Sequence, residues 1–225
     1  MGKTYFITGT DTGVGKTLVA ASLLRLAHAR GLSTLGLKPV AAGCEPSNGQ
    51  WMNDDARLLM EASSMAVDYA AVNPVALREA MAPHIAAERE GREILCAELV
   101  DQYKSLVDQA DFTVIEGAGG WQVPLNDTET MANLAAQLNY PVIMVVGIRL
   151  GCINHALLTA AAIRQSGLHL AGWVANHIDA DMPVAEENVK TLEQRLDAPL
   201  IGRVRWQDKI DLAAFAQQLH LEQLL

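Results

Sequence analysis

The sequence is short of cysteine, of basic residues and of long apolar runs, and each shortage excludes a class of protein. Three widely spaced cysteines, Cys44, Cys96 and Cys152, make neither a disulfide framework nor a zinc pair, so we expect reduced thiols and a cytoplasmic location. Lys and Arg number 17 against 26 Asp and Glu, and the net charge of −9 argues against extended nucleic-acid binding. No apolar run approaches the ~18–20 residues that span a bilayer, and the first residues lack a secretory-signal pattern. We therefore expect neither a membrane nor a nucleic-acid partner.

What the 225 residues do contain is an alternation of strand-like and helical segments. Strands are predicted at 4–8, 33–40, 111–117, 141–148, 170–177 and 198–204, and helices at 16–30, 129–139, 153–167, 184–196 and 209–219. This rhythm predicts an α/β fold of the P-loop nucleoside triphosphate hydrolase type, with a single doubly wound parallel sheet in one domain over residues 1–225. Residues 43–53 are predicted to form a loop, and residues 63–93 an excursion over one edge of the site.

The segment 8–17, TGTDTGVGKT, lies between the first predicted strand and the first predicted helix. Glycines let a backbone curl until its amides point at phosphate oxygens, and the following helix adds the positive end of its dipole. Lys16 is expected to reach the β- and γ-phosphates, and the Thr17 hydroxyl to ligate Mg²⁺. Because Thr10 stands where the usual motif has its first glycine, a glycine-rich turn with a helix-capping threonine is the alternative.

Charged residues also mark the ends of other predicted strands. Ligands gather at the carboxyl ends of parallel strands, so Lys38, Glu116 and Asn176 are candidates for one shared cleft. Asp55 and Glu116, with Thr17, are hard oxygen ligands suited to Mg²⁺. The alternatives are a lysine snorkelling at a strand end for Lys38, a helix N-cap for Asp55 and a solvent-facing charge for Glu116.

With TGTDTGVGKT, KPVAAG, EGAGGW, LGCINHALLTA and GWVAN in this order, the chain resembles the dethiobiotin synthetase family from about residue 4 to residue 202. The resemblance implies an ATP- and Mg²⁺-dependent ring closure in biotin synthesis, in which 7,8-diaminononanoate, CO₂ and ATP give dethiobiotin, ADP and phosphate. It also implies a cytoplasmic homodimer. For this chemistry an amine captures CO₂ as a carbamate, phosphorylation gives a carbamic–phosphoric anhydride, and the second amine closes the cyclic urea without a protein nucleophile.

The resemblance also implies a set of site residues. It makes Lys16 and Lys38 catalytic and picks Asp55 rather than its neighbour Asp54 as a metal ligand with Thr17 and Glu116. Nucleotide contacts are expected from Gly13, Val14, Gly15, Lys16, Thr17, Leu18, Asp55, Glu116, Gly117, Ala118, Gly119, Asn176, His177, Arg205, Trp206 and Gln207. Substrate contacts are expected from Thr12, Lys38, Ala42, Gly151, Cys152, Ile153 and Asn154.

One of these assignments carries an alternative, and one further segment extends the set. Residues 151–154 reach the partner subunit's substrate in the family, and simple helix capping by Asn154 is the alternative. Pro83 and His84 are placed over the substrate chain, and an ordinary turn is the alternative.

Several positions depart from the family pattern. Ala42 replaces a common hydroxyl residue, and Arg205 stands near the adenine where members commonly have proline, so Trp206 is expected either to cover the base or to pack in the core. Residues 176–179, NHID, resemble a guanine-reading element, yet ATP is the expected nucleotide because no GTPase motif follows Glu116.

Three other functions are alternatives to the family's activity. One is a partition-type P-loop ATPase, but Asp11 stands at the position where that class has its signature lysine. The others are an amidating synthase, whose glutaminase domain we do not expect within these 225 residues, and a non-catalytic nucleotide-binding paralogue.

Overall fold

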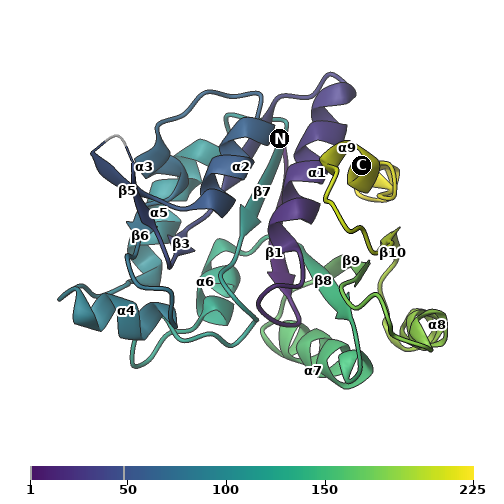
Figure 1. Cartoon of the computed structure of the whole chain (residues 1–225). Coiled ribbons are helices and arrows are strands. Elements are labelled where there is room, and N and C mark those ends of the chain that lie inside the picture. Colours follow the sequence, from purple (N-terminus) through teal and green to yellow (C-terminus); the bar gives the residue numbers. More distant parts are fainter. Residues whose placement is uncertain (1, 48) are drawn as a thin grey trace.

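The computed structural model describes residues 2–47 and 49–225, and a six-stranded sheet lies at its centre (Figure 1). The strands are β1 (Lys3–Gly9), β2 (Thr34–Leu37), β7 (Phe112–Glu116), β8 (Val142–Ile148), β9 (Leu170–His177) and β10 (Leu200–Val204). Their order is β10-β9-β8-β1-β7-β2, and each neighbouring pair is parallel. The six predicted strands are all present, and the predicted α/β class with a doubly wound parallel sheet is confirmed.

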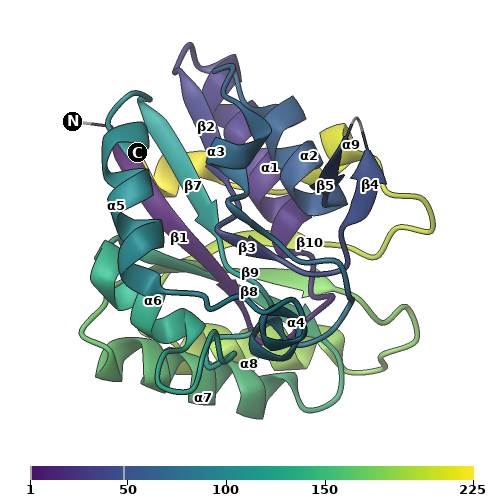
Figure 2. The same cartoon turned by 90° about the vertical axis from the view of Figure 1, so that its left-hand side faces the viewer.

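Helices cover both faces of this sheet because its strands are apolar on both sides (Figure 2). One face carries α1 (Lys16–Ala29), α9 (Leu212–Ala216) and the short 3₁₀ helix η1 (Leu221–Gln223). The other carries α5 (Cys96–Val107), α6 (Met131–Leu138), α7 (Cys152–Gln165) and α8 (Ala185–Arg195). Successive residues of a strand point to opposite faces of the sheet. Phe6 therefore packs in the core under α5–α8, and Ile7 in the core under α1 and α9.

The connection from β2 to β7 holds the elements that the sequence analysis did not resolve. They are β3 (Val40–Ala41), β4 (Glu45–Ser47), β5 (Gln50–Met52), α2 (Asp54–Ala62), α3 (Tyr69–Val72), β6 (Val75–Ala76), α4 (Pro83–Arg89) and α5. The predicted loop at 43–53 is wrong in part, because β4 and β5 pair as an antiparallel hairpin; Asn48, between them, lies outside the described residues. The excursion at 63–93 contains α3, β6 and α4.

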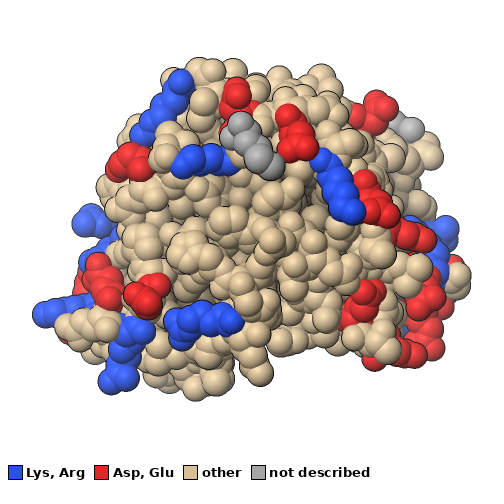
Figure 3. Space-filling model, turned by 180° about the vertical axis from the view of Figure 1, so that it is seen from behind, with Lys and Arg blue, Asp and Glu red and all other residues tan. Residues whose placement is uncertain are grey.

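The surface of the chain is mixed in charge. On the face seen from behind, Lys and Arg side chains are interspersed with Asp and Glu around a broad uncharged area (Figure 3). Within the part of the chain that the structure describes, no helix has both the length and the apolar character needed to cross a membrane. That residues 1–225 act as one domain stays a prediction.

Candidate active site

The loop between β1 and α1 has the backbone form that phosphate binding requires. Gly13 and Gly15 have φ values of 74° and 91°, a left-handed conformation that glycine adopts without strain. The loop is braced from β9, because the Asn176 amide donates to the carbonyl of Val14 at 2.8 Å. A Cβ at Gly15 would lie 2.4 Å from that amide nitrogen, so only glycine fits there. No acidic residue lies in the first turn of α1, which leaves its N-terminus favourable to an anion.

Lys16 begins α1 and is buried beside this loop. Its ammonium donates to the carbonyl of Asp11 at 3.1 Å. Burial lowers the pKa of Lys16 to about 8, although Glu116 nearby acts in the opposite direction. A triphosphate placed against the loop would supply the negative charge that this buried ammonium lacks. The Asp11 carboxylate is occupied elsewhere, since it forms an ion pair with Arg149, which follows β8.

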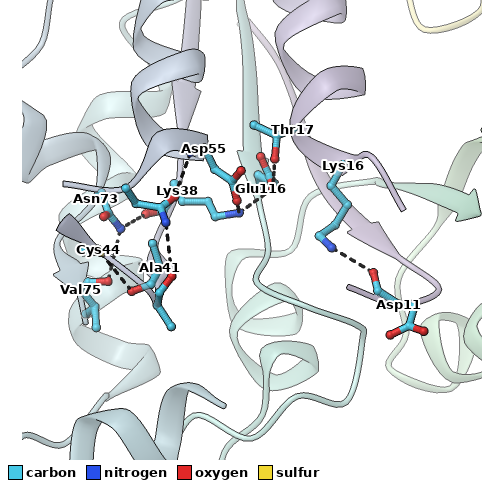
Figure 4. A network of polar contacts seen from close by, with 12 residues as sticks. Asp11, Lys16, Thr17, Lys38, Ala41, Cys44, Asp55, Asn73, Val75 and Glu116 are labelled. Atoms are coloured by element: carbon cyan, nitrogen blue, oxygen red, sulfur yellow. Dashed lines mark hydrogen bonds and ion pairs between the residues drawn. The ribbon is translucent and has the colours of Figure 1, made fainter. Parts of the chain in front are cut away.

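Lys38, Asp55 and Glu116 meet in one cluster, although they come from three different elements (Figure 4); Lys38 and Glu116 are buried, whereas the Asp55 side chain is partly exposed. Lys38 follows β2, Glu116 ends β7 and Asp55 lies in the first turn of α2. The Lys38 ammonium lies 2.5 Å from Oε1 of Glu116 and 2.9 Å from Oδ2 of Asp55. Burial by itself would lower the pKa of Lys38, but the two carboxylates outweigh it and raise that pKa. Burial opposes ionisation of Asp55 too, yet Lys38 lowers the pKa of Asp55 below its ordinary value.

This cluster excludes the simpler interpretations of its members. The Lys38 side chain is 4% exposed and does not snorkel, and Glu116, at 1%, does not face solvent. The N-cap of α2 is Asn53 rather than Asp55, because the Asn53 side chain accepts from the Asp55 N–H at 3.0 Å. Asp54 is 98% exposed on its side chain and pairs only with Arg57 among the described residues. Asp55, and not Asp54, therefore belongs to the cluster around Lys38.

The oxygen atoms of the cluster fit a magnesium ion. The Thr17 hydroxyl donates to Oε1 of Glu116 at 2.9 Å, which places three candidate ligands together. Oε2 of Glu116 is buried, and no described residue donates a hydrogen bond to it. A buried carboxylate oxygen without a partner is costly, and Mg²⁺ prefers such oxygens. Residues 2–47 and 49–225 hold no group of three His, Cys, Asp or Glu placed for a metal, so the protein alone offers an incomplete shell.

A cleft of about 900 Å³ joins the phosphate loop to this cluster. The predicted site residues that line it are Thr12, Gly13, Gly15, Lys16, Thr17, Leu18, Lys38, Ala42, Asp55, Glu116, Ala118 and Gly119. Pro83 also lines it, at the first position of α4, so part of the 63–93 excursion does border the site. Asp54 borders the cleft as well, and the lining residues that were not predicted from the sequence are Ala41, Asn53, Leu58, Ala80, Met81, Ala82, Val123, Pro124 and Ile210. These are mostly small or apolar residues in aperiodic segments, which carry no chemical signal.

The remaining predicted residues lie outside the lining of this cleft. They are Val14, Gly117, Gly151, Cys152, Ile153, Asn154, Asn176, His177, Arg205, Trp206 and Gln207. Asn176 is buried against the phosphate loop, and the His177 ring lies 2.7 Å from the carbonyl of Val204. Trp206 is half exposed, with its indole donating to Asp208, so the core position considered for it is wrong. Asn154 does not cap α7, because Gly151 is the N-cap and no side chain bonds there.

Comparisons with known proteins agree on one family. The profile of a family described as AAA domain matches residues 3–214. A Cellvibrio japonicus protein named ATP-dependent dethiobiotin synthetase BioD is 56% identical over 223 residues, which cover 99% of this chain and 98% of that protein. A Pseudomonas aeruginosa protein of the same name is 50% identical over 221 residues, covering 98% and 97%. The MinC:MinD cell division complex of Aquifex aeolicus matches with a TM-score of 0.60 at 14% identity, over 98% of this chain and 88% of that one, which shows a shared fold alone.

Proposed function

This chain belongs to the ATP-dependent dethiobiotin synthetase family, and we infer from that membership that it is an enzyme that forms dethiobiotin with ATP in biotin biosynthesis. The observation that carries the inference is an identity of at least 50% with these relatives over nearly the whole chain. The family resemblance predicted from the motifs is thereby confirmed. The convergence of two lysines and three candidate metal ligands on one cleft supports an active enzyme over a non-catalytic paralogue.

A partition-type ATPase is the rival that the fold alone would allow, since the structural likeness extends to MinD. The residue at the position of that class's signature lysine is Asp11, whose carboxylate pairs with Arg149. An acid in an ion pair cannot supply the positive charge that the signature lysine brings to the phosphates. The site therefore favours the synthetase.

We propose that the reaction proceeds through a carbamate. One amine of 7,8-diaminononanoate captures CO₂, and a carbamate oxygen then attacks the γ-phosphorus of ATP while ADP leaves. The second amine attacks the carbonyl carbon of the resulting carbamic–phosphoric anhydride, and phosphate departs as the cyclic urea closes. Lys16 and the loop amides hold the β- and γ-phosphates, and Lys38 neutralises the carbamate and the transferring phosphoryl group. Such a reaction needs positioning and charge stabilisation rather than a protein nucleophile.

Mg²⁺ completes the proposed site. When bound, it would supply positive charge against the phosphates, and Thr17, Asp55 and Glu116 are the residues that would hold it. The buried and unpartnered Oε2 of Glu116 supports this assignment. The nucleotide's phosphate oxygens and water would fill the rest of its shell.

The outer parts of the site remain proposals that rest on the family. Asn176, His177 and residues 205–207 are proposed for the adenine, and Thr12, Ala42 and residues 151–154 for the substrate. We propose a homodimer in which residues 151–154 of each subunit reach the other subunit's substrate. Apolar side chains exposed beside that segment support it, since Leu150 is 89% and Leu158 is 62% exposed in the single chain. Three free, buried cysteines fit the proposed cytoplasmic location.

One assay tests the function. Purified protein is incubated with Mg-ATP, bicarbonate and 7,8-diaminononanoate, and mass spectrometry follows the cyclic urea. We expect dethiobiotin and ADP in equal amounts, with no product when any single component is omitted. ATP turnover that ignores the diamine and bicarbonate but responds to DNA or lipid vesicles would instead identify a partition-type ATPase.

A further inference from the structure

The peptide group of Lys38 is held on both sides by the segment that contains α3. The Lys38 N–H donates to the carbonyl of Val72 at 2.9 Å. The Lys38 carbonyl accepts from the side-chain amide of Asn73 at 2.7 Å, and the same amide donates to the carbonyl of Val75 at 3.3 Å (Figure 4). Asn73 therefore fixes the backbone from which the catalytic lysine projects.

The same segment also holds the start of α2, which carries Asp55. The Tyr69 hydroxyl donates to Oδ1 of Asn73 at 2.8 Å and accepts from the Asn53 N–H at 2.7 Å. Asn53 in turn caps α2 through the Asp55 N–H. A continuous series of hydrogen bonds thus runs from the Asp55 backbone through Asn53, Tyr69 and Asn73 to the Lys38 backbone. The Lys38–Asp55 ion pair closes it into a ring.

Burial makes this series rigid. Tyr69 is 7% and Asn73 2% exposed, and each polar atom of the two side chains has a partner. A fully satisfied buried network specifies one arrangement, whereas loss of one member leaves its neighbours unpaired at a cost. Burial also raises the pKa of Tyr69, so its hydroxyl keeps the proton that it donates to Asn73.

We propose that Tyr69 and Asn73 are positioning residues for the dethiobiotin-forming reaction, which set the separation between the Lys38 ammonium and the Asp55 carboxylate. Neither side chain lines the cleft, so they act through the residues that they hold. The proposal rests on the proposed function for its catalytic meaning. Its geometric part concerns the metal ligand Asp55 and is tested without turnover.

The test compares Tyr69→Phe with Tyr5→Phe. Both changes remove one buried hydroxyl, but that of Tyr5 donates to the carbonyl of Leu224, near the amino end of β1 and away from the cleft. Mn²⁺ binding to the full chain with ADP is measured by electron paramagnetic resonance, and thermal unfolding and steady-state kinetics are measured alongside. We expect Tyr69→Phe to lose Mn²⁺ affinity about fivefold and kcat about tenfold, the latter equal to ~1.4 kcal/mol, with KM for the diamine within about twofold. Both variants are expected to lower the unfolding temperature by similar amounts, because each loses one buried hydrogen bond. Tyr5→Phe is expected to leave the Mn²⁺ affinity and kcat unchanged.

A loss of Mn²⁺ affinity confined to Tyr69→Phe supports the proposal. Equal Mn²⁺ affinities in Tyr69→Phe, Tyr5→Phe and the natural chain overturn it, whatever happens to kcat. A natural chain that forms no cyclic urea would defeat the proposed function, while the Mn²⁺ comparison would still decide whether Tyr69 positions Asp55. A second variant, Asn73→Ser, keeps a short polar group but withdraws the amide from Lys38, and it is expected to lower kcat in the same way.

Discussion

The ammonium of Lys38 lies 2.5 Å from Oε1 of Glu116, and both side chains are almost completely buried. In the free chain, the Lys38 ammonium is thus paired with Asp55 and Glu116, the same carboxylates that are proposed to hold Mg²⁺. An ion pair in such surroundings is strong only while both partners are present, because either charge alone would be buried without compensation. This relationship links catalysis, metal binding and stability in one pair.

Replacing Lys38 by methionine is expected to separate these roles. The rate of dethiobiotin formation should fall at least about 100-fold, or ~2.7 kcal/mol, because the carbamate loses its cation. The metal-free variant should also lose about 3–5 kcal/mol of unfolding free energy, since Glu116 becomes an unpaired buried charge. Adding Mg²⁺ should raise the unfolding free energy of Lys38→Met by more than it raises that of the natural chain. Lys104→Met, which removes an exposed lysine paired with Asp101, is the control. An unchanged rate in Lys38→Met would remove this lysine from the mechanism.

Replacing Lys16 by alanine is expected to abolish ATP turnover, because the β- and γ-phosphates lose their nearest cation. Turnover is measured as ADP release with saturating diamine and bicarbonate. Lys190→Ala, on the exposed side of α8, provides a matched loss of charge. Near-normal ADP release by Lys16→Ala would refute the assignment of the phosphate loop.

The lowered pKa of Lys16 predicts a pH dependence of nucleotide binding. In the free chain this pKa is about 8, and bound phosphates should raise it, so nucleotide binding takes up protons near that pH. Affinity for ADP should therefore fall as pH rises above 8, by up to about tenfold per pH unit. Calorimetric titration from pH 7.5 to 9.5 in buffers of different ionisation enthalpy measures both the affinity and the proton uptake. Lys16→Ala should remove the uptake, and an affinity that stays level above pH 8 would contradict the prediction.

The same pKa predicts how the free chain's stability varies with pH. The unfolded chain binds more protons than the folded one between pH 8 and the ordinary lysine range, so the contribution of Lys16 to stability rises with pH there. Urea unfolding of the natural chain and of Lys16→Met across this range measures the difference. A natural chain that loses stability relative to Lys16→Met as pH rises would contradict the assigned direction.

Neighbouring acids of α2 allow a sharp test of the metal ligands. Asp55→Asn and Glu116→Gln should each raise the Mg²⁺ concentration for half-maximal activity at least about tenfold, because a neutral amide is a poorer ligand for a hard cation. Asp54→Asn, one residue away and exposed, should not change it. Mn²⁺ titration with ADP provides the same comparison without turnover. Equal metal requirements for the Asp54 and Asp55 variants would exclude Asp55 as a ligand.

Local sequence patterns were sufficient to predict the sheet and the meeting of Lys38 and Glu116 in the candidate site. The apolar run at 141–148 indicates a buried strand, and the glycines before Lys16 indicate a phosphate loop, from neighbouring residues alone. The parallel topology then brings Lys38 and Glu116 to one edge of the sheet. The helix α5 carried a usable signal that was missed, since Leu99, Val100, Tyr103 and Val107 are buried at helical spacing.

Other parts had no such local signal. Asn53, Tyr69 and Asn73 contact one another across an aperiodic stretch, and their hydrogen bonds depend on how that stretch folds back onto β2. Residues 151–154 and 205–207 remain predictions because they lie outside the lining of the cleft in a single chain. A second subunit or a bound nucleotide would be needed to complete those contacts.

The brace from Asn176 to the carbonyl of Val14 has an evolutionary consequence. The side-chain amide that is proposed to recognise the base also stabilises, through its hydrogen bond to Val14, the loop that is proposed to bind the phosphates. A substitution at position 176 would alter the choice of nucleobase and the grip on the triphosphate together. Relaxed nucleotide preference is therefore not expected to arise at this position without a loss of turnover, and a lineage that acquired it would need a compensating change within the loop.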